Sequence, residues 1–230
     1  MPCPKCGKPE AVPSAWCACP DCIAKYDAEM AALQDRARVE AVERLWRQSG
    51  LAGPWRSKTF ESFDVRLQPA AFNACRRYAE TFLDNQGESL ALIGEDYGIG
   101  KTHLAVSVGN YVLSNFMRSV VFTTGQELML RLRATFSNRD ATEYELLSAI
   151  RDADLVILDD VGKEKYSEYV ESIYYHVINS RYVASKPILL TSNLAWADLG
   201  ERIGYAAMSR LSEMCRVVEM RGNDYRLKRS

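Results

Sequence analysis

Apolar positions in the second half of the chain alternate between short runs and helical spacing. Five short apolar runs are each typical of a buried strand: Leu90–Ile93, Val120–Thr123, Leu155–Leu158, Ile188–Leu190 and Val217–Met220. Between them the apolar residues recur every three or four positions, which predicts helices over Lys101–Met117, Gln126–Phe136, Tyr144–Asp152 and Glu168–Val183. Such alternation predicts an α/β protein whose parallel sheet is covered by helices on both faces.

Two further helices are predicted before this alternating part. Residues 24–48 contain neither Gly nor Pro, and their apolar positions share one helical face: Tyr26, Met30, Leu33, Ala37, Ala41 and Leu45. This helix either packs on its own protein or docks on a partner. A second amphipathic pattern covers residues 66–85, and the stretch GLAGPW between the two helices marks a linker.

We therefore divide the chain into a cysteine-rich module (1–23), an amphipathic helix (24–50), a linker (51–65) and an α/β domain (66–230). Hydrophobic residues make up 47% and charged residues 26%, which supports a folded core, and the net charge of −1 excludes binding to nucleic acid by bulk charge alone. The sequence has no run of 18 apolar residues, and its start, MPCPKCGKPE, lacks the apolar stretch of a signal peptide. We expect a cytoplasmic protein with no membrane partner and with reduced cysteines.

Cysteines concentrate near the N-terminus. The pairs Cys3/Cys6 and Cys19/Cys22 are both Cys-x-x-Cys and stand twelve residues apart, and Cys17 is able to replace Cys19. In a reducing compartment such pairs are typical of structural Zn²⁺, because two tight turns supply the four thiolates of a tetrahedron. Few apolar residues surround them, so a metal would have to hold this module together. The alternative is an unfolded tail that binds metal by chance.

A glycine-rich loop follows the first strand of the α/β part, in SLALIGEDYGIGKTHLAVSV. A strand that turns through glycines into a helix is the setting of a phosphate-binding loop, because several N–H groups converge on phosphate oxygens at the helix N-terminus. Lys101 would contact the β- and γ-phosphates, and the Thr102 hydroxyl would bind Mg²⁺. The candidate nucleotide-binding residues of this loop are Gly98, Ile99, Gly100, Lys101, Thr102 and His103. We expect His103 to pack or cap the helix rather than to act as a base.

The spacing of this loop departs from the common one. Five residues separate Gly94 and Gly100, where the usual pattern has four. We expect the extra residue to bulge at Glu95–Tyr97 and to leave the amide groups that follow unaffected.

Polar residues follow two later strands. In ADLVILDDVG, Asp159 and Asp160 emerge at the carboxyl end of a buried strand, the edge at which ligands of open α/β sheets bind. Asp159 would hold Mg²⁺ through its water shell, and Asp160 would orient the attacking water as a base. In LLTSN, Thr191 and Asn193 would stand beside these acids and bind the γ-phosphate or the water, unless Asn193 only caps its strand.

Arginines near the C-terminus are candidates for stabilising the charge of phosphoryl transfer. Arg202 and Arg210 lie in GERIGYAAMSRLSEM, and Arg226 lies in the tail. An arginine that reaches the nucleotide of a neighbouring subunit would make hydrolysis depend on assembly. The alternative is that these side chains are solvated surface charge.

Taken in order, GIGKTHLA, LVILDDVG, LLTSN and MSRLSEM…GNDYR resemble the AAA+ ATPases of the DnaC/DnaI/IstB group, over residues 51–230. The resemblance implies an AAA+ P-loop fold with a five-stranded, mainly parallel sheet between helices. It also implies a reduced lid, since only 37 residues follow Asn193. By position it implies Walker A at Lys101 and Thr102, Walker B at Asp159 and Asp160, sensor 1 at Asn193, an arginine finger at Arg210 and a sensor-2-like arginine at Arg226.

The resemblance also implies a function. Its members usually load a ring-shaped replicative helicase onto single-stranded DNA, with ATP as the switch, and dock on the helicase through their N-terminal region. Zinc modules occur there in similar loaders, which suits the cysteine pairs. ATP, Mg²⁺ and Zn²⁺ are the implied cofactors. Asp160 stands where Glu is more common, and its shorter reach predicts slow hydrolysis.

DNA contact is a separate hypothesis. Arg131 and Arg133 lie beside Phe136, and basic groups next to aromatic rings are typical of single-strand binding. The leucines interleaved with them favour a helix that simply packs on the core. Three alternative functions stay open: an IstB-like transposition helper, a zinc-dependent nucleotide-binding adaptor without hydrolysis, and a P-loop kinase, for which we find neither an acceptor site nor a mobile lid.

Overall fold

The computed structural model describes residues 20–135 and 143–225, with side chains from residue 23 onward. The chain forms two compact units, Met1–Arg44 and Leu45–Ser230. Helix α1 (Pro20–Ser49) accounts for the described residues of the first unit and ends in the second. It begins four residues before the predicted start, at a proline, which is tolerated in the first turn because its missing N–H has no helical partner there.

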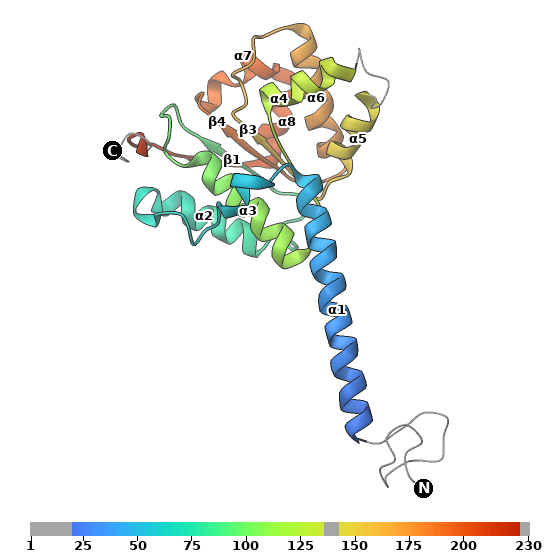
Figure 1. Ribbon diagram of the computed structural model, residues 1–230. Helices are drawn as coiled ribbons and strands as arrows, with labels where there is room; N and C mark the ends of the chain where they lie inside the picture. The colour runs from blue at the N-terminus through green and yellow to red at the C-terminus, as the bar shows by residue number, and fades with distance from the viewer. Residues whose placement is uncertain (1–19, 136–142, 226–230) are drawn as a thin grey trace. The chain divides into compact units, whose positions relative to one another are not determined.

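The second unit is built on one sheet (Figure 1). Its strands are β1 (Ser89–Ile93), β2 (Val120–Thr124), β3 (Leu155–Asp159), β4 (Ile188–Ser192) and β5 (Cys215–Glu219). They lie in the order β2-β3-β4-β1-β5, and every neighbouring pair is parallel. The predicted five-stranded sheet is confirmed, and β5 begins two residues earlier than the apolar run suggested.

Helices cover both faces of this sheet (Figure 1). One layer contains α2 (Pro69–Glu80) and α3 (Lys101–Phe116). The other contains α4 (Gly125–Thr135), α5 (Glu143–Asp152), α6 (Glu168–Val183), α7 (Gly200–Ile203) and α8 (Tyr205–Met214). Short 3-10 helices occur at η1 (Gly53–Ser57), η2 (Val65–Leu67) and η3 (Trp196–Asp198).

Strand alternation divides the core between the two layers. Val156 and Leu158 join the buried cluster formed with α4 to α8. Ile157, between them, points to the opposite face, where Gly109 of α3 comes so close that a Cβ there would lie 2.7 Å from its Cδ1. All five residues of β1, β3 and β4 are buried, as expected for the central strands of a two-sided sheet.

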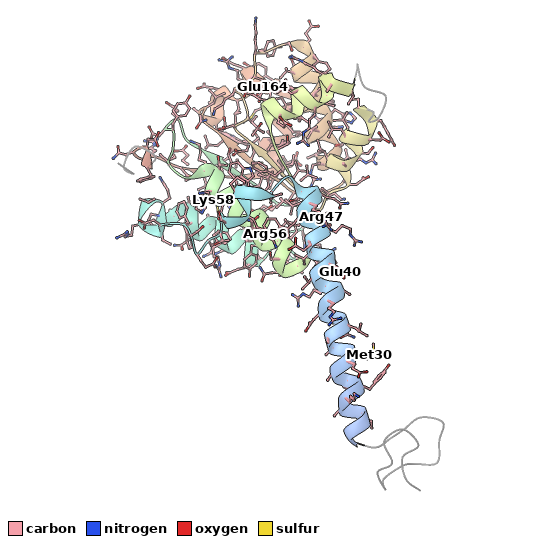
Figure 2. The ribbon with its side chains drawn as sticks, in the orientation of Figure 1. Met30, Glu40, Arg47, Arg56, Lys58 and Glu164 are labelled. Carbon is pink, nitrogen blue, oxygen red and sulfur yellow. The ribbon has the colours of Figure 1, made fainter. Side chains whose placement is uncertain are left out.

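Residues 51–65, predicted to be a linker, are packed into the second unit. Leu51, Phe60 and Phe63 are buried. The Asn110 amide of α3 donates to the carbonyl oxygens of Trp55 (2.9 Å) and Lys58 (2.8 Å), the latter labelled in Figure 2. The division at residue 66 therefore separates residues that pack together, because the aromatic side chains of the segment complete the α2–α3 layer.

None of the helices in the described part of the chain combines the length and the apolar character needed to cross a membrane.

Candidate nucleotide-binding site

The loop between β1 and α3 has the backbone of a phosphate cradle. Gly98 and Gly100 adopt φ of +66° and +99°, which glycine reaches without steric cost. A Cβ on Gly100 would lie 2.7 Å from the Phe63 ring, and one on Gly98 would collide with the Asp224 carboxylate. Gly100 is also the N-cap of α3 and has no side chain to cap it, so the first N–H groups of the helix are available to an anion.

The extra residue of this loop was expected to bulge at Glu95–Tyr97. These three residues are exposed, Tyr97 by 60%, whereas Ile99 beyond them is buried. The Asp96 carboxylate accepts a hydrogen bond from the Gly222 amide (3.0 Å), which ties the loop to the segment that follows β5.

Lys101 is held inside the loop. It is 5% exposed, and its Nζ donates to the carbonyl oxygens of Gly94 (2.6 Å) and Asp96 (2.7 Å). Burial lowers the pKa of Lys101 to about 8, although the negative charges of Asp160 and Asp96 act in the opposite direction. A phosphate oxygen beside this amine would favour its charged form.

Two hydroxyl groups meet at the Asp159 carboxylate. Thr102, in the first turn of α3, donates to both of its oxygens (2.9 and 3.1 Å), and Thr191, on β4, donates to Oδ1 (2.6 Å). Asp159 is 3% exposed, and burial raises the pKa of its carboxyl while the two hydroxyl groups lower it. The hydroxyl and the carboxylate predicted to bind Mg²⁺ are thus neighbours.

Asp160 lies directly beyond the end of β3 with a φ of +56°, a conformation that Asp and Asn reach more readily than most residues. Its N–H donates to the Thr191 hydroxyl (2.9 Å). Its carboxylate accepts from Asn193 Nδ2 (3.0 Å) and from Lys163 Nζ (2.8 Å). The structure therefore brings Asp160 and Asn193 together, as the sequence predicted.

These residues fit a triphosphate with its magnesium. The uncapped helix start leaves N–H groups available to phosphate oxygens, the two glycines give the loop its positive-φ backbone, and Lys101 lies beside them. Within residues 23–135 and 143–225, no three His, Cys, Asp or Glu side chains gather around one metal position. Mg²⁺ does not require such a cluster, because phosphates and water supply most of its ligands. Thr102 and Asp159 are the residues that would hold it.

His103 faces away from this site. Its Nε2 lies 3.1 Å from the Thr59 carbonyl oxygen and 3.1 Å from the Ser62 hydroxyl, and its ring meets Phe63 edge-on at 5.2 Å. Burial lowers the pKa of His103. The side chain fastens the start of α3 to the segment before it, so the structure gives His103 the packing role and no contact with the nucleotide-binding groups.

Arg210 lies on α8 and is bound by α6 of the same chain. Its guanidinium donates to Asn179 Oδ1 (2.7 Å) and to the Tyr175 hydroxyl (3.1 Å), and it stacks on the Tyr175 ring at 4.7 Å. These contacts fasten Arg210 to α6, and none of them is to a residue of the phosphate loop. Arg202 is exposed on α7.

The remaining predicted residues form no shared site in the described residues. Arg131 forms an exposed ion pair with Glu127 (2.7 Å), and Arg133 is exposed near the end of α4. Several predicted positions lie outside the described residues: Phe136, Arg226, Cys3, Cys6, Cys17 and Cys19. Cys22 lies in the first turn of α1, and its side chain is also outside them.

Comparison with known protein families identifies the family to which this chain is similar. The sequence profile described as "IstB-like ATP binding protein" matches residues 26–230. The chain belongs to this family. Two relatives of the IstB-like chain are named for different processes. The replicative helicase loader DnaC of Escherichia coli strain K12 is 27% identical over 79% of this chain and 74% of its own length. The insertion sequence IS21 putative ATP-binding protein of Pseudomonas aeruginosa is 30% identical over 76% of this chain and 66% of its own length.

Solved structures confirm the AAA+ fold of this IstB-like protein. The DnaC helicase loader matches with a TM-score of 0.65 over 74% of this chain and 100% of its own, at 23% identity. DnaI matches with a TM-score of 0.64 over 76% and 100%, at 21% identity. AMPPCP-bound DnaA from Aquifex aeolicus matches with a TM-score of 0.63 over 76% and 53%, at 23% identity.

Sequence reasoning missed three parts of the site of this IstB-like chain. Lys163 binds Asp160, Phe63 packs under Gly100, and Asp224 lies against Gly98. Only Lys163 had a usable signal, an opposite charge three residues beyond Asp160. Glu164 beside it, labelled in Figure 2, is buried and accepts a hydrogen bond from the Gly162 amide (3.0 Å).

Proposed function

We propose that this protein is an ATPase that loads a replicative helicase onto single-stranded DNA, with ATP binding and slow hydrolysis as its switch. The observation that supports this most is the contact between Thr102 and Asp159, which joins the phosphate loop to the acidic strand. Relatives in the same ATP-binding family are named as replicative helicase loaders.

Each site residue has a role in this proposal. Bound Mg²⁺–ATP supplies the phosphoanhydride bond that hydrolysis breaks. The amides of the glycine loop and the Lys101 amine bind its phosphates, and Thr102 and Asp159 hold its metal. Asp160 accepts a proton from the attacking water, and Asn193 orients the Asp160 carboxylate through their 3.0 Å hydrogen bond.

Slow turnover follows from the surroundings of Asp160. One of its oxygens accepts a hydrogen bond from Asn193 and the other from Lys163. These two donors stabilise the carboxylate and occupy part of its acceptor capacity, which makes it a weaker base towards water. Its side chain is also one methylene shorter than the glutamate more common at this position in the resembling ATPases.

Contacts with the partners belong to the N-terminal part and to α4 in this proposal. Cys3, Cys6, Cys19 and Cys22, with Cys17 as a substitute, hold Zn²⁺ in a module that docks with α1 on the helicase. Arg131 and Arg133 contact single-stranded DNA. The zinc site and the DNA contact are supported by the sequence patterns, and docking on the helicase is supported by the resemblance to helicase loaders.

Loading is tested with the full chain, its cognate helicase and circular single-stranded DNA. We expect ATP-dependent retention of the helicase on the DNA. Lys101→Ala is expected to weaken ATP binding about 10- to 100-fold, because it removes charge-assisted hydrogen bonds to phosphate, and to abolish retention at ATP concentrations that suffice for the wild type. Lys165→Ala, an exposed lysine elsewhere in the chain, is the control. Wild-type protein that binds ATP and does not retain the helicase would contradict the loader function.

Arg210 is proposed to act on the nucleotide of a neighbouring subunit. Arg210→Ala alone and Asp160→Asn alone should each hydrolyse ATP slowly. Mixing them should restore part of the activity, because the Arg210→Ala subunit keeps an intact site and the Asp160→Asn subunit supplies the arginine. Steady-state phosphate release from the single variants and from the mixture measures this. If the mixture hydrolyses no faster than the sum of its parts, Arg210 does not act between subunits.

A transposition helper is the second candidate, favoured by the 30% identity to the IS21 protein of Pseudomonas aeruginosa. The two candidates share the ATP site and differ in partner. Stimulation of a transposase by this chain, without any effect on helicase retention, would select the second.

A further inference from the structure

Lys163 lies in the loop after β3, three residues beyond Asp160. Its Nζ donates to Asp160 Oδ2 at 2.8 Å, while Asn193 occupies the other oxygen of the same carboxylate. The Lys163 amine is therefore within hydrogen-bonding distance of the group proposed as the base. The two side chains are about one-third exposed, so the contact is open to exchange.

The same amine reaches the phosphate loop. Lys163 Nζ lies 5.6 Å from the centre of the Tyr97 ring, on the ring face that attracts cations. Tyr97 belongs to the longer part of the loop, whose carbonyl groups at Gly94 and Asp96 hold Lys101. Lys163 thus bridges the acidic strand and the phosphate loop.

Lys163 is close enough to the other charged groups of the site to affect their pKa values. Its positive charge contributes to lowering the pKa of Lys101, after burial, and acts against the raised pKa of Asp159. Two lysine amines and two aspartate carboxylates therefore share one region at the carboxyl edge of the sheet. The terminal phosphate of a triphosphate, which carries more negative charge than one carboxylate, would attract both amines.

We propose that Lys163 is a second phosphate-contacting cation of this site, which exchanges its contact with Asp160 for the γ-phosphate when ATP is bound, while the Tyr97 ring holds it over the loop. This inference rests on the ATP binding of the proposed function. The exchange frees one oxygen of Asp160 for water only when a γ-phosphate is present. In this proposal the extra residue of the loop lengthens the part that carries Tyr97, so that the Tyr97 ring reaches Lys163.

Two alternatives to this proposal, an ordinary surface ion pair and a general distortion of the loop, predict different effects of removing Lys163 on nucleotide affinity. An ion pair that is about one-third exposed and three residues apart contributes little to stability, and its removal would leave nucleotide affinity unchanged. A general distortion of the loop would weaken ATP and ADP binding equally. Loss of a contact with the γ-phosphate would weaken the binding of the triphosphate alone, because ADP lacks that group.

The test is equilibrium binding of AMPPCP and of ADP, each with Mg²⁺, to the full chain by isothermal titration calorimetry. Lys163→Ala should weaken AMPPCP binding at least about tenfold, as loss of a charge-assisted hydrogen bond does, and leave ADP binding within about twofold. Lys163→Arg should retain most of the affinity. Tyr97→Leu should weaken AMPPCP binding about two- to fivefold. Lys165→Ala should change the affinity for neither ligand.

Equal effects of Lys163→Ala on both ligands, or no effect on either, would overturn this inference and leave the ATP site itself standing. Wild-type protein that binds neither ligand would overturn the proposed function as well. Melting curves of each variant show whether it is folded, and Lys163→Gln replaces the alanine variant if that one is not. A loss confined to AMPPCP supports the contact.

Discussion

Asp160→Asn is expected to lower the rate of ATP hydrolysis about 10²- to 10⁴-fold and to leave ATP affinity nearly unchanged. Asparagine is close to aspartate in shape but cannot accept the proton of the attacking water, and a positioned base contributes an acceleration of that size. The substitution suits the backbone, because asparagine also tolerates the φ of +56° at this position. The Asn193 hydrogen bond to this side chain is retained by the amide oxygen.

Single-turnover hydrolysis and calorimetric binding of AMPPCP measure the two effects separately. Asp198→Asn makes the same charge change at an exposed position and should alter neither. If Asp160→Asn hydrolyses ATP at the wild-type rate, another group is the base. If it binds ATP poorly, the carboxylate takes part in holding the nucleotide rather than in the chemical step.

Arg181→Met is expected to lower the free energy of unfolding by about 3–5 kcal/mol, an effect of the size seen when a buried hydrogen-bond network loses its centre. Arg181 is fully buried, and burial lowers its pKa to about 10. Its guanidinium donates to five backbone carbonyl groups: Ile150, Arg151, Ala153, Asp154 and Pro187. Methionine fills much of the volume but leaves these acceptors without donors.

Urea denaturation followed by circular dichroism measures this change. Arg77→Met on α2 removes an exposed arginine and should shift the free energy of unfolding by no more than about 0.5 kcal/mol. A loss in Arg181→Met as small as in this control would mean that water or a rearranged α5–β3 turn satisfies the carbonyl groups. The prediction concerns stability alone, since Arg181 contacts none of the groups at the phosphate loop.

The parts of the fold that depend on local pattern were predictable from the sequence. An apolar run such as Leu155–Leu158 must be buried on both faces, and the paired aspartates after it must then lie at the carboxyl edge. Glycines followed by Lys101 and Thr102 likewise predicted the loop and the start of α3. Helix α8 was not among the predicted helices, although its buried residues Ala207 and Leu211 stand four positions apart, as on one helical face.

Contacts between distant parts of the chain could not be predicted in the same way. Nothing in the composition of residues 51–65 indicates that Phe63 packs against Gly100 or that His103 is bound by Thr59. Lys163 and Asp160 lie close in sequence, but the proposed role of Lys163 also depends on Tyr97, which only the folded loop brings near. The roles of Arg210 and the cysteine pairs involve other molecules, and they stay predictions.

The packing of Phe63 and His103 has a mechanical consequence. The first turn of α3 carries Lys101 and Thr102 on one side and is fastened by His103 to Thr59 and Ser62 on the other. A displacement of that turn would therefore be resisted by two hydrogen bonds and by the packing of the His103 ring against Phe63. Residues 59–63 and the turn that carries Lys101 and Thr102 thus form one packed part of the second unit, and a substitution at residue 59, 62 or 63 is expected to alter the nucleotide site from outside it.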